Sequence, residues 1–137
     1  NIKIVAIQEG QYLADPALKA TQNILQANPG LDVIASSGDQ MIVGAEEAVN
    51  DAGKKGKVVL VGNGASEIGV QAVKEGRWFG TAVYLPLSEG YEATKVAIRA
   101  ARGEEGLPTS VNTDDLAKPS TVISKDNADE FKPEWAG

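Results

Sequence analysis

Three carboxylates stand where acid–base chemistry or cation binding would need them. Glu9, Asp15 and Asp39 each follow or flank a short apolar run, and paired carboxylates can act as general acid and base or hold a hard cation. Asp15 and Asp39 also stand directly before helical patterns, where a carboxylate caps the helix N-terminus. Capping is the favoured role for both, and Asp39 is also placed to face a ligand.

A glycine-rich run, residues 61–66, follows a strand pattern and opens a helix. In the dinucleotide fingerprint G-x-G-x-x-G the third glycine would fall at Glu67, whose carboxylate would repel a pyrophosphate at the helix N-terminus. A tight strand-to-helix turn is therefore the favoured interpretation, because glycine permits unusual dihedral angles.

Nucleophilic catalysis lacks its usual partners in this sequence. The 137 residues contain no histidine and no cysteine, which removes the commonest general base and any thiolate. Ser36, Ser37 and Ser66 have no base beside them in the sequence. We therefore expect a binding module and not an enzyme, with no catalytic residue, no cofactor and no metal.

Aromatic side chains offer binding contacts instead. Tyr12 lies in a polar loop before a helix, where its ring could stack on a sugar or equally cover that helix. Tyr84 ends a strand pattern, and its hydroxyl is placed to hydrogen-bond a ligand. Trp78 and Phe79 precede that strand and are expected to pack in the core or at a hinge.

Short strand patterns alternate with helical patterns along the chain. The expected strands, rich in Val and Ile, are residues 2–7, 32–36, 57–61, 78–85 and 121–123. The expected helices are residues 16–27, 40–52, 67–75 and 89–102, capped by Asp15, Asp39, Ser66 and Ser88. This order predicts an α/β fold, a three-layer Rossmann-like sandwich with a mostly parallel sheet, right-handed crossovers and helices on both faces.

The carboxyl ends of the expected strands define the predicted ligand edge, because ligands bind there in open parallel sheets. Four residues fall at these ends and are the predicted ligand contacts: Tyr12, Asp39, Asn63 and Tyr84. Tyr12 is expected to stack on the ligand and the other three to hydrogen-bond it.

Composition bears on the partners. Thirteen basic against nineteen acidic residues give a net charge of −6, which argues against nucleic acid because a polyanion needs clustered cations. No apolar run approaches the roughly 20 residues of a membrane-spanning helix. The chain opens directly into an apolar run without an initiator Met or a signal-peptide pattern, so we expect a mature form or, preferably, a fragment.

An ordered set of segments carries a resemblance to a known family. They are the helix, Pro turn and strand of residues 25–34, Gly38-Asp39-Gln40-Met41-Ile42-Val43-Gly44-Ala45, Val61-Gly62-Asn63-Gly64-Ala65, residues 75–86 and residues 123–131. Together they resemble periplasmic sugar-binding proteins of the ribose-binding type, the substrate-binding components of ABC importers. The resemblance covers nearly the whole chain in the right order.

The resemblance implies two α/β lobes with the ligand between them, of which this chain is most of the second. The N-terminal lobe and the strand and helix that open the second lobe would be missing. Residues 1–86 would form the main part of the C-terminal ligand-binding lobe, 87–119 the helix and loop that cross to the missing lobe, and 120–137 the returning strand and tail.

The implied function is binding of a small sugar or polyol for delivery to the membrane permease of an ABC importer. The implied location is periplasmic or extracellular, with a lipid anchor in a Gram-positive organism. The family's sugar-binding Asn, Asp and hinge Gln align with Gly38, Gly64 and Tyr84, while its stacking aromatic aligns with Tyr12. These departures leave the particular sugar open and bring polyols within range.

Two alternatives remain open at this point. The effector domain of a lac-repressor-type transcription regulator shares the fold, although the acidic charge and the tail after Ile123 favour the importer. A nucleotide-binding Rossmann enzyme is opposed by Glu67 and by the missing histidine.

Self-association of the fragment is a further expectation. The helix 89–102 carries an apolar face of Tyr91, Thr94, Ala97, Ile98 and Ala101, with Leu87 ahead of it. Without the other lobe this face would lie exposed in a monomer.

Overall fold

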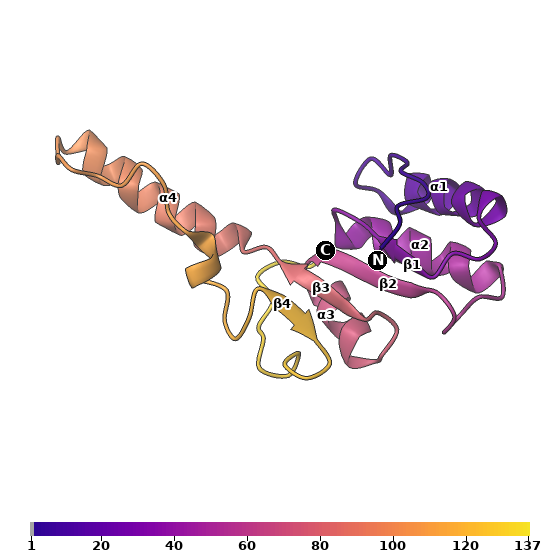
Figure 1. Cartoon of the computed structure of the whole chain (residues 1–137). Helices are drawn as coiled ribbons and strands as arrows, with labels where there is room; N and C mark the ends of the chain where they lie inside the picture. Colours follow the sequence, from indigo (N-terminus) through magenta and orange to yellow (C-terminus); the bar gives the residue numbers. More distant parts are fainter. Residues whose placement is uncertain (1) are drawn as a thin grey trace.

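The computed structural model describes residues 2–137 and shows a layered α/β body from which one helix projects (Figure 1). The elements in chain order are α1 (Ala14–Ala27), β1 (Val33–Ala35), α2 (Asp39–Asp51), β2 (Val59–Gly64), α3 (Glu67–Lys74), β3 (Gly80–Val83), α4 (Pro86–Ala101), the 3-10 helix η1 (Thr113–Asp115) and β4 (Val122–Ser124). Each expected helix is present, and so is each expected strand except the first.

The four strands form one sheet in the order β1-β2-β3-β4. β1, β2 and β3 are parallel, with Ile34 opposite Leu60 and Gly62 opposite Thr81. β4 returns antiparallel to β3, where Ile123 pairs with Thr81. The predicted α/β class with a mostly parallel sheet is therefore confirmed.

Residues 2–7 form no strand, so the prediction of a first strand is wrong for this structure. The segment makes no backbone hydrogen bond within the described residues, and Ile2 is 99% exposed. A strand needs a neighbour for its N–H and C=O groups. No described residue supplies one to residues 2–7, so their strand-like composition does not lead to a strand in this structure.

Helices cover one face of the sheet and leave the other open, so the expectation of helices on both faces is not met. Along β2 the buried Leu60 alternates with the partly exposed Val59, and Val33 and Val122 on the same open face are half-exposed. Both crossovers, through α2 and through α3, advance the same way across the sheet. Right-handed crossovers that advance in one direction place their helices on the same face.

The core lies between this covered face and the helices. It includes Leu60 from the sheet, Ile42 and Val49 from α2, and Val73 from α3. Trp78 is 2% exposed and belongs to the same cluster, as expected. Its neighbour Phe79 is instead 72% exposed, so the core placement, one of the two expected for these rings, does not hold for Phe79.

The first helix begins earlier than its predicted cap. α1 starts at Ala14 with Leu13 as N-cap, and no side chain caps it. Asp15 and Pro16 therefore lie inside the first turn, so the predicted cap at Asp15 is wrong. Proline is tolerated in a first turn because the N–H that it lacks would have no helical partner there.

Of the caps predicted for α2, α3 and α4, one is confirmed and two are wrong. Ser66 caps α3 as predicted, accepting a hydrogen bond from Gly69 N at 3.0 Å. Asp39 is the first residue of α2 and not its cap, a position that Gly38 holds. α4 starts at Pro86, which places Ser88 within its first turn and not at its cap.

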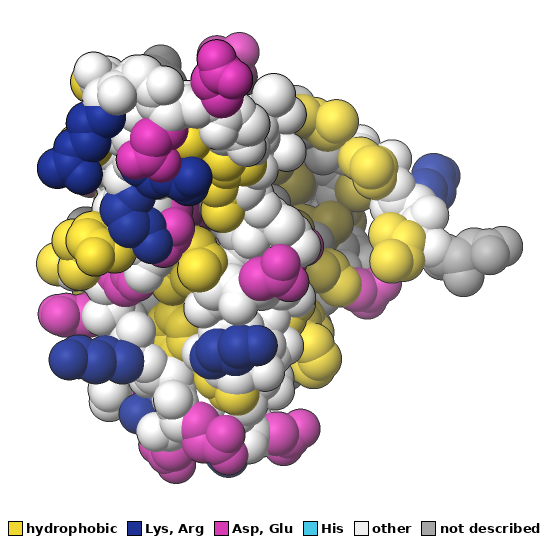
Figure 2. Space-filling view, turned by 90° about the vertical axis from the view of Figure 1, so that its left-hand side faces the viewer, with side chains coloured by type: hydrophobic (Ala, Val, Ile, Leu, Met, Phe, Trp, Pro, Cys, Tyr) yellow, Lys and Arg dark blue, Asp and Glu magenta, His cyan; other side chains and the backbone are white. Residues whose placement is uncertain are grey.

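The last helix projects from the body, and the segment that follows runs back beside it (Figure 1). No residue of α4 is buried. A groove of about 430 Å³ lies between α4 and the returning segment, lined by Val96, Pro108 and Val111 among others. Figure 2 views the molecule from this side and shows apolar side chains lying among acidic and basic ones.

Candidate functional site

A buried carboxylate forms the base of the predicted ligand edge. Asp39 is 0% exposed. Its Oδ2 accepts hydrogen bonds from the backbone N (2.9 Å) and Oγ (2.8 Å) of Ser66, and its Oδ1 accepts one from Thr81 Oγ1 at 2.7 Å. One side chain thus joins the start of α2, the turn after β2 and the middle of β3.

Glycines make room for this carboxylate. A Cβ at Gly62 or Gly69 would overlap the Asp39 carboxylate, and one at Gly64 would lie 3.1 Å from its Oδ2. Gly64 also has a φ of +147°, a value that side chains rarely allow. The glycines of residues 61–66 therefore serve the turn and the buried Asp39.

The same turn is poorly suited to phosphate. The backbone N–H groups of Glu67 and Ile68, at the start of α3, already donate to the carbonyls of Trp135 and Ala136 at 2.9 and 3.3 Å. The Asp39 carboxylate lies directly beneath, bonded to Ser66. A phosphate would have to displace the C-terminal residues and approach a carboxylate, so the tight-turn interpretation fits this geometry and nucleotide binding does not.

Tyr12 stands at the surface of the ligand edge. Its side chain is 62% exposed, and its ring lies over Gly38, where a Cβ would be 3.0 Å from Tyr12 Cδ1. Gln11 and Tyr12 both have left-handed backbones, with φ of 53° and 54°. Such dihedral angles are uncommon for non-glycine residues and cluster at ligand sites, where surrounding structure maintains them.

Asn63 and Tyr84 lie at the same edge. Asn63 Nδ2 is 3.5 Å from the Ser37 carbonyl, which connects the end of β2 to the loop before α2. Tyr84 follows β3, is 50% exposed, and donates its backbone N–H to the Gly64 carbonyl at 3.4 Å.

Of the four predicted ligand contacts, Tyr12, Asn63 and Tyr84 are at least partly exposed at this edge. Asp39 lies behind them with both carboxylate oxygens already hydrogen-bonded.

Comparison with known proteins identifies the family of this chain. Residues 1–105 match the periplasmic binding protein domain. The chain belongs to this family. The resemblance found in the sequence is thereby confirmed.

Two curated relatives of this periplasmic binding protein domain illustrate the match. The D-allose-binding periplasmic protein of Escherichia coli is 31% identical over 132 residues, which cover 96% of this chain and 37% of that protein. The xylitol-binding protein of Mycolicibacterium smegmatis is 31% identical over 130 residues, covering 94% of this chain and 35% of the relative. The chain thus spans less than two fifths of the length of these relatives.

Solved structures show the same fold. A periplasmic solute-binding protein of an ABC transporter from Actinobacillus succinogenes, solved with bound D-allose, superposes with a TM-score of 0.82 at 30% identity, over 94% of this chain and 44% of that one. A solute-binding protein from Bacillus halodurans gives a TM-score of 0.80 at 23% identity, which shows the shared fold alone.

Trp135, which lies beyond the matched residues 1–105, also contributes to the edge, and the sequence did not indicate it. Its indole Nε1 donates to the Gly64 carbonyl at 2.9 Å, and a Cβ on Gly64 would lie 2.7 Å from Trp135 Cζ2. The ring therefore covers the turn that carries Asn63. The one available signal was a lone tryptophan in a polar tail, which does not reveal its partner.

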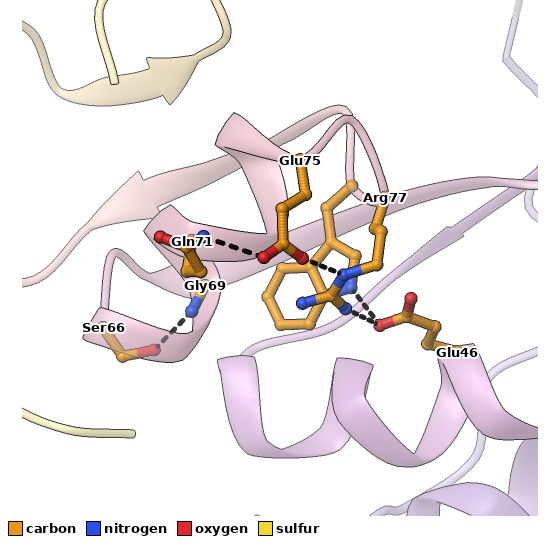
Figure 3. A network of polar contacts seen from close by, with 7 residues as sticks. Glu46, Ser66, Gly69, Gln71, Glu75 and Arg77 are labelled. Carbon is orange, nitrogen blue, oxygen red and sulfur yellow. Dashed lines mark hydrogen bonds and ion pairs between the residues drawn. The ribbon is translucent and has the colours of Figure 1, made fainter. Parts of the chain in front are cut away.

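A second polar network lies at the opposite, amino-terminal end of β3 (Figure 3). Arg77 bonds Glu75 and Glu46, and Trp78 Nε1 donates to Glu46 Oε2 at 2.9 Å. Hydrogen bonds from Gln71 and then Arg77 lower the pKa of Glu75. Burial disfavours the charged guanidinium of Arg77, but the bonds to Glu75 and Glu46 outweigh it and raise its pKa. This network joins α2 to the α3–β3 turn, away from the ligand edge.

Among residues 2–137, no helix combines the length and the apolar character that a membrane span needs.

Proposed function

We propose that this chain is most of the second lobe of a two-lobed sugar- or polyol-binding protein that serves an ABC importer. Membership of the periplasmic binding protein family supports this, as do relatives whose names record D-allose and xylitol. The observation that carries the proposal is the placement of an exposed tyrosine ring, Tyr12, beside polar groups at the carboxyl edge of the sheet.

The edge suits a sugar because a sugar has an apolar face and a polar rim. The Tyr12 ring offers an apolar surface that can stack on the ring carbons. The Asn63 amide and the Tyr84 hydroxyl supply donors and acceptors for ligand hydroxyls. We assign Asp39 a supporting role, since it holds Ser66 and Thr81 at the base of the turn and presents no free oxygen.

Ligand choice within this class depends on what the edge lacks. Gly38 and Gly64 offer no side chains, and the space beside Gly64 is occupied by the Trp135 ring. Polar groups at these two positions are therefore not available to the ligand. A binding site rejects a ligand strongly when the ligand leaves a buried polar group without its hydrogen-bond partner. The preferred ligand should therefore have a different pattern of hydroxyl groups from ribose. Polyols fit this proposal.

The open face of the sheet favours the proposal that this chain is part of a longer protein. Val33, Val59 and Val122 expose apolar surface there, and residues 2–7 lie without backbone partners. In the family the second lobe opens with a further strand and helix, which would pair with and cover these groups. We propose that those elements and the N-terminal lobe belong to the same natural protein, with α4 and residues up to 119 crossing to that lobe.

The remaining proposals concern the partner protein and the location in the cell. The partner is the membrane permease of an ABC importer, and the location is periplasmic or extracellular, with a lipid anchor in a Gram-positive host. The matches described above favour this function over a lac-repressor-type regulator or a nucleotide-binding enzyme.

Replacing Tyr12 tests the stacking role. In the two-lobed protein, Tyr12→Ala is expected to weaken binding of D-allose or xylitol about tenfold, because the loss of the stacking contact, about 0.5–1.5 kcal/mol, adds to the loss of buried apolar area. Isothermal titration calorimetry measures this. Phe79→Ala is the matched control, since Phe79 is a similarly exposed aromatic residue at the amino-terminal end of β3, away from the ligand edge.

Unchanged affinity in Tyr12→Ala would refute the stacking role. The 137-residue chain alone should bind these ligands far more weakly than the two-lobed protein, because half of the cleft is absent. Micromolar binding by the chain alone would contradict the two-lobed proposal.

Self-association of the isolated chain is expected through α4. Leu87, Tyr91 and Ile98 on this helix are all exposed, and burying Leu87 and Ile98 is worth about 3–6 kcal/mol on transfer scales. Sedimentation velocity should show a concentration-dependent dimer that Ile98→Asp returns to monomer. Ile2→Asp is the control, because Ile2 is exposed but far along the chain from α4. A wild-type chain that stays monomeric at high concentration would refute the expectation.

A further inference from the structure

The projecting helix has almost nothing to fix its direction. No residue of α4 is buried, and Leu85, which precedes it, is the buried residue at its base. The segment that returns beside α4 buries none of its residues, so packing alone does not fix the direction of the helix. The contacts at its first turn therefore decide how it leaves the body.

A single distant carboxylate makes those contacts. Glu134 Oε2 accepts the backbone N–H of Ser88 at 2.9 Å, and Glu134 Oε1 accepts the Ser88 hydroxyl. The N–H groups of a first helical turn have no helical partner, and the N-cap of α4, Leu85, supplies no side-chain acceptor. A carboxylate at this end is also favoured by the helix dipole. Glu134 thus caps α4 from a position 46 residues along the chain.

The next residue along the chain holds the ligand edge. Trp135 Nε1 donates to the Gly64 carbonyl, and Trp135 O accepts the backbone N–H of Glu67, both at 2.9 Å. Phe131, which is buried, anchors the tail to the core just before these residues. Two consecutive side chains therefore contact two different places, the first turn of α4 and the turn after Asn63.

We propose that Glu134 and Trp135 form a tail clamp that positions α4 relative to the ligand edge. Glu134 is the positioning residue for the helix, and Trp135 ties the same stretch of backbone to the Gly64 turn. The mention of a ligand rests on the proposed function, whereas the clamp itself concerns contacts within this chain. Because coupling between two sites is reciprocal, a displacement of the Gly64 turn should alter the orientation of α4, and the reverse.

Paired spin labels can measure the orientation of α4. The 137 residues contain no cysteine, so Lys55→Cys on the body and Arg102→Cys at the far end of α4 accept labels at defined sites. Both positions are exposed. Pulsed electron spin resonance then gives the distribution of distances between them, measured at low concentration without any ligand.

Glu134→Ala is expected to broaden that distribution at least about twofold, because α4 loses its only distant cap. Glu134→Gln should give an intermediate width, since an amide oxygen still accepts the Ser88 N–H without the charge. Glu130→Ala is the matched control, an exposed glutamate on the same tail, and should leave the width unchanged. An unchanged width in Glu134→Ala, or equal broadening in Glu130→Ala, overturns the positioning role.

Amide hydrogen exchange tests the connection through Trp135. Trp135→Phe keeps an aromatic ring, smaller than the indole, but removes the donor to Gly64, and it should speed exchange at Ser88 as well as at Glu67. Glu134→Ala should speed exchange at Ser88 roughly tenfold, the effect of losing one charge-assisted hydrogen bond. Faster exchange at Glu67 with none at Ser88 in Trp135→Phe would overturn the coupling. Because no sugar is present, these results stand apart from the success or failure of the proposed function.

Discussion

Replacing Asp39 by alanine is expected to lower the free energy of unfolding by about 3–5 kcal/mol. The substitution removes the acceptor of three hydrogen bonds, from Ser66 N, Ser66 Oγ and Thr81 Oγ1. Each of these donors would be left buried, at a cost of about 1–3 kcal/mol per unsatisfied group. A cavity beside Gly62 and Gly69 would add to the loss.

The asparagine variant separates hydrogen bonding from packing. Asp39→Asn keeps the volume, and its carbonyl oxygen can still face both Ser66 donors. Its amide must then face Thr81 Oγ1, whose hydroxyl hydrogen would turn towards the Ala82 carbonyl, 3.4 Å away. We expect a loss of about 1–2 kcal/mol for this variant, because one good hydrogen bond becomes a poor one.

Urea unfolding monitored by circular dichroism measures both variants. Asp51→Ala is the control, because Asp51 is an exposed aspartate at the other end of the same helix and should change stability by less than about 0.5 kcal/mol. An Asp39→Ala protein as stable as Asp51→Ala would show that the buried network contributes nothing.

The case of Asp39 shows what the sequence can and cannot supply. Its place between a strand and a helix predicted that it would lie at the carboxyl edge of the sheet, and it does. Its burial depends on the glycines at 62 and 69 and on Thr81, which come from other elements. A cap and a buried network anchor have the same local sequence, so the role could only be decided by three-dimensional contacts.

The fold itself was largely predictable because its signals are local. Helical periods and short Val- and Ile-rich runs identified the four α-helices and the strands from β1 to β4, but not the short 3-10 helix η1. Residues 2–7 carry the same local signal, yet a strand needs a hydrogen-bonded neighbour, and none of residues 2–137 provides one for this segment. The composition of residues 2–7 is typical of a strand, but composition does not show whether a neighbouring strand is present to pair with it.

The contacts of the C-terminal tail could not be predicted from the sequence, for a different reason. Trp135 meets Gly64 across 71 residues, and Glu134 meets Ser88 across 46. Neither pair shares a spacing or a motif that a single sequence displays. Contacts of this length follow from the path of the whole chain around the sheet.

Replacing Gly44 by alanine is the second large effect that we expect. Alanine normally improves a helix interior by up to about 1 kcal/mol relative to glycine. Here α1 crosses α2 directly at Gly44, and a Cβ would overlap the Ala14 carbonyl and lie 2.9 Å from the backbone N of Leu18. Both obstacles are backbone atoms, so no side-chain rotation relieves the clash. We therefore expect destabilisation of about 2–4 kcal/mol.

Gly90→Ala provides the matched control, since Gly90 lies inside α4 and a Cβ there would meet nothing within 4 Å. It should leave stability unchanged or raise it by up to about 1 kcal/mol, the opposite sign to Gly44→Ala. Urea unfolding compares the two, and equal stabilisation by both would contradict the close crossing. The consequence reaches the site, because α1 begins two residues after Tyr12. A separation of α1 from α2 would move Tyr12 off Gly38, so in the two-lobed protein that we propose, Gly44→Ala should weaken sugar binding even in the molecules that remain folded.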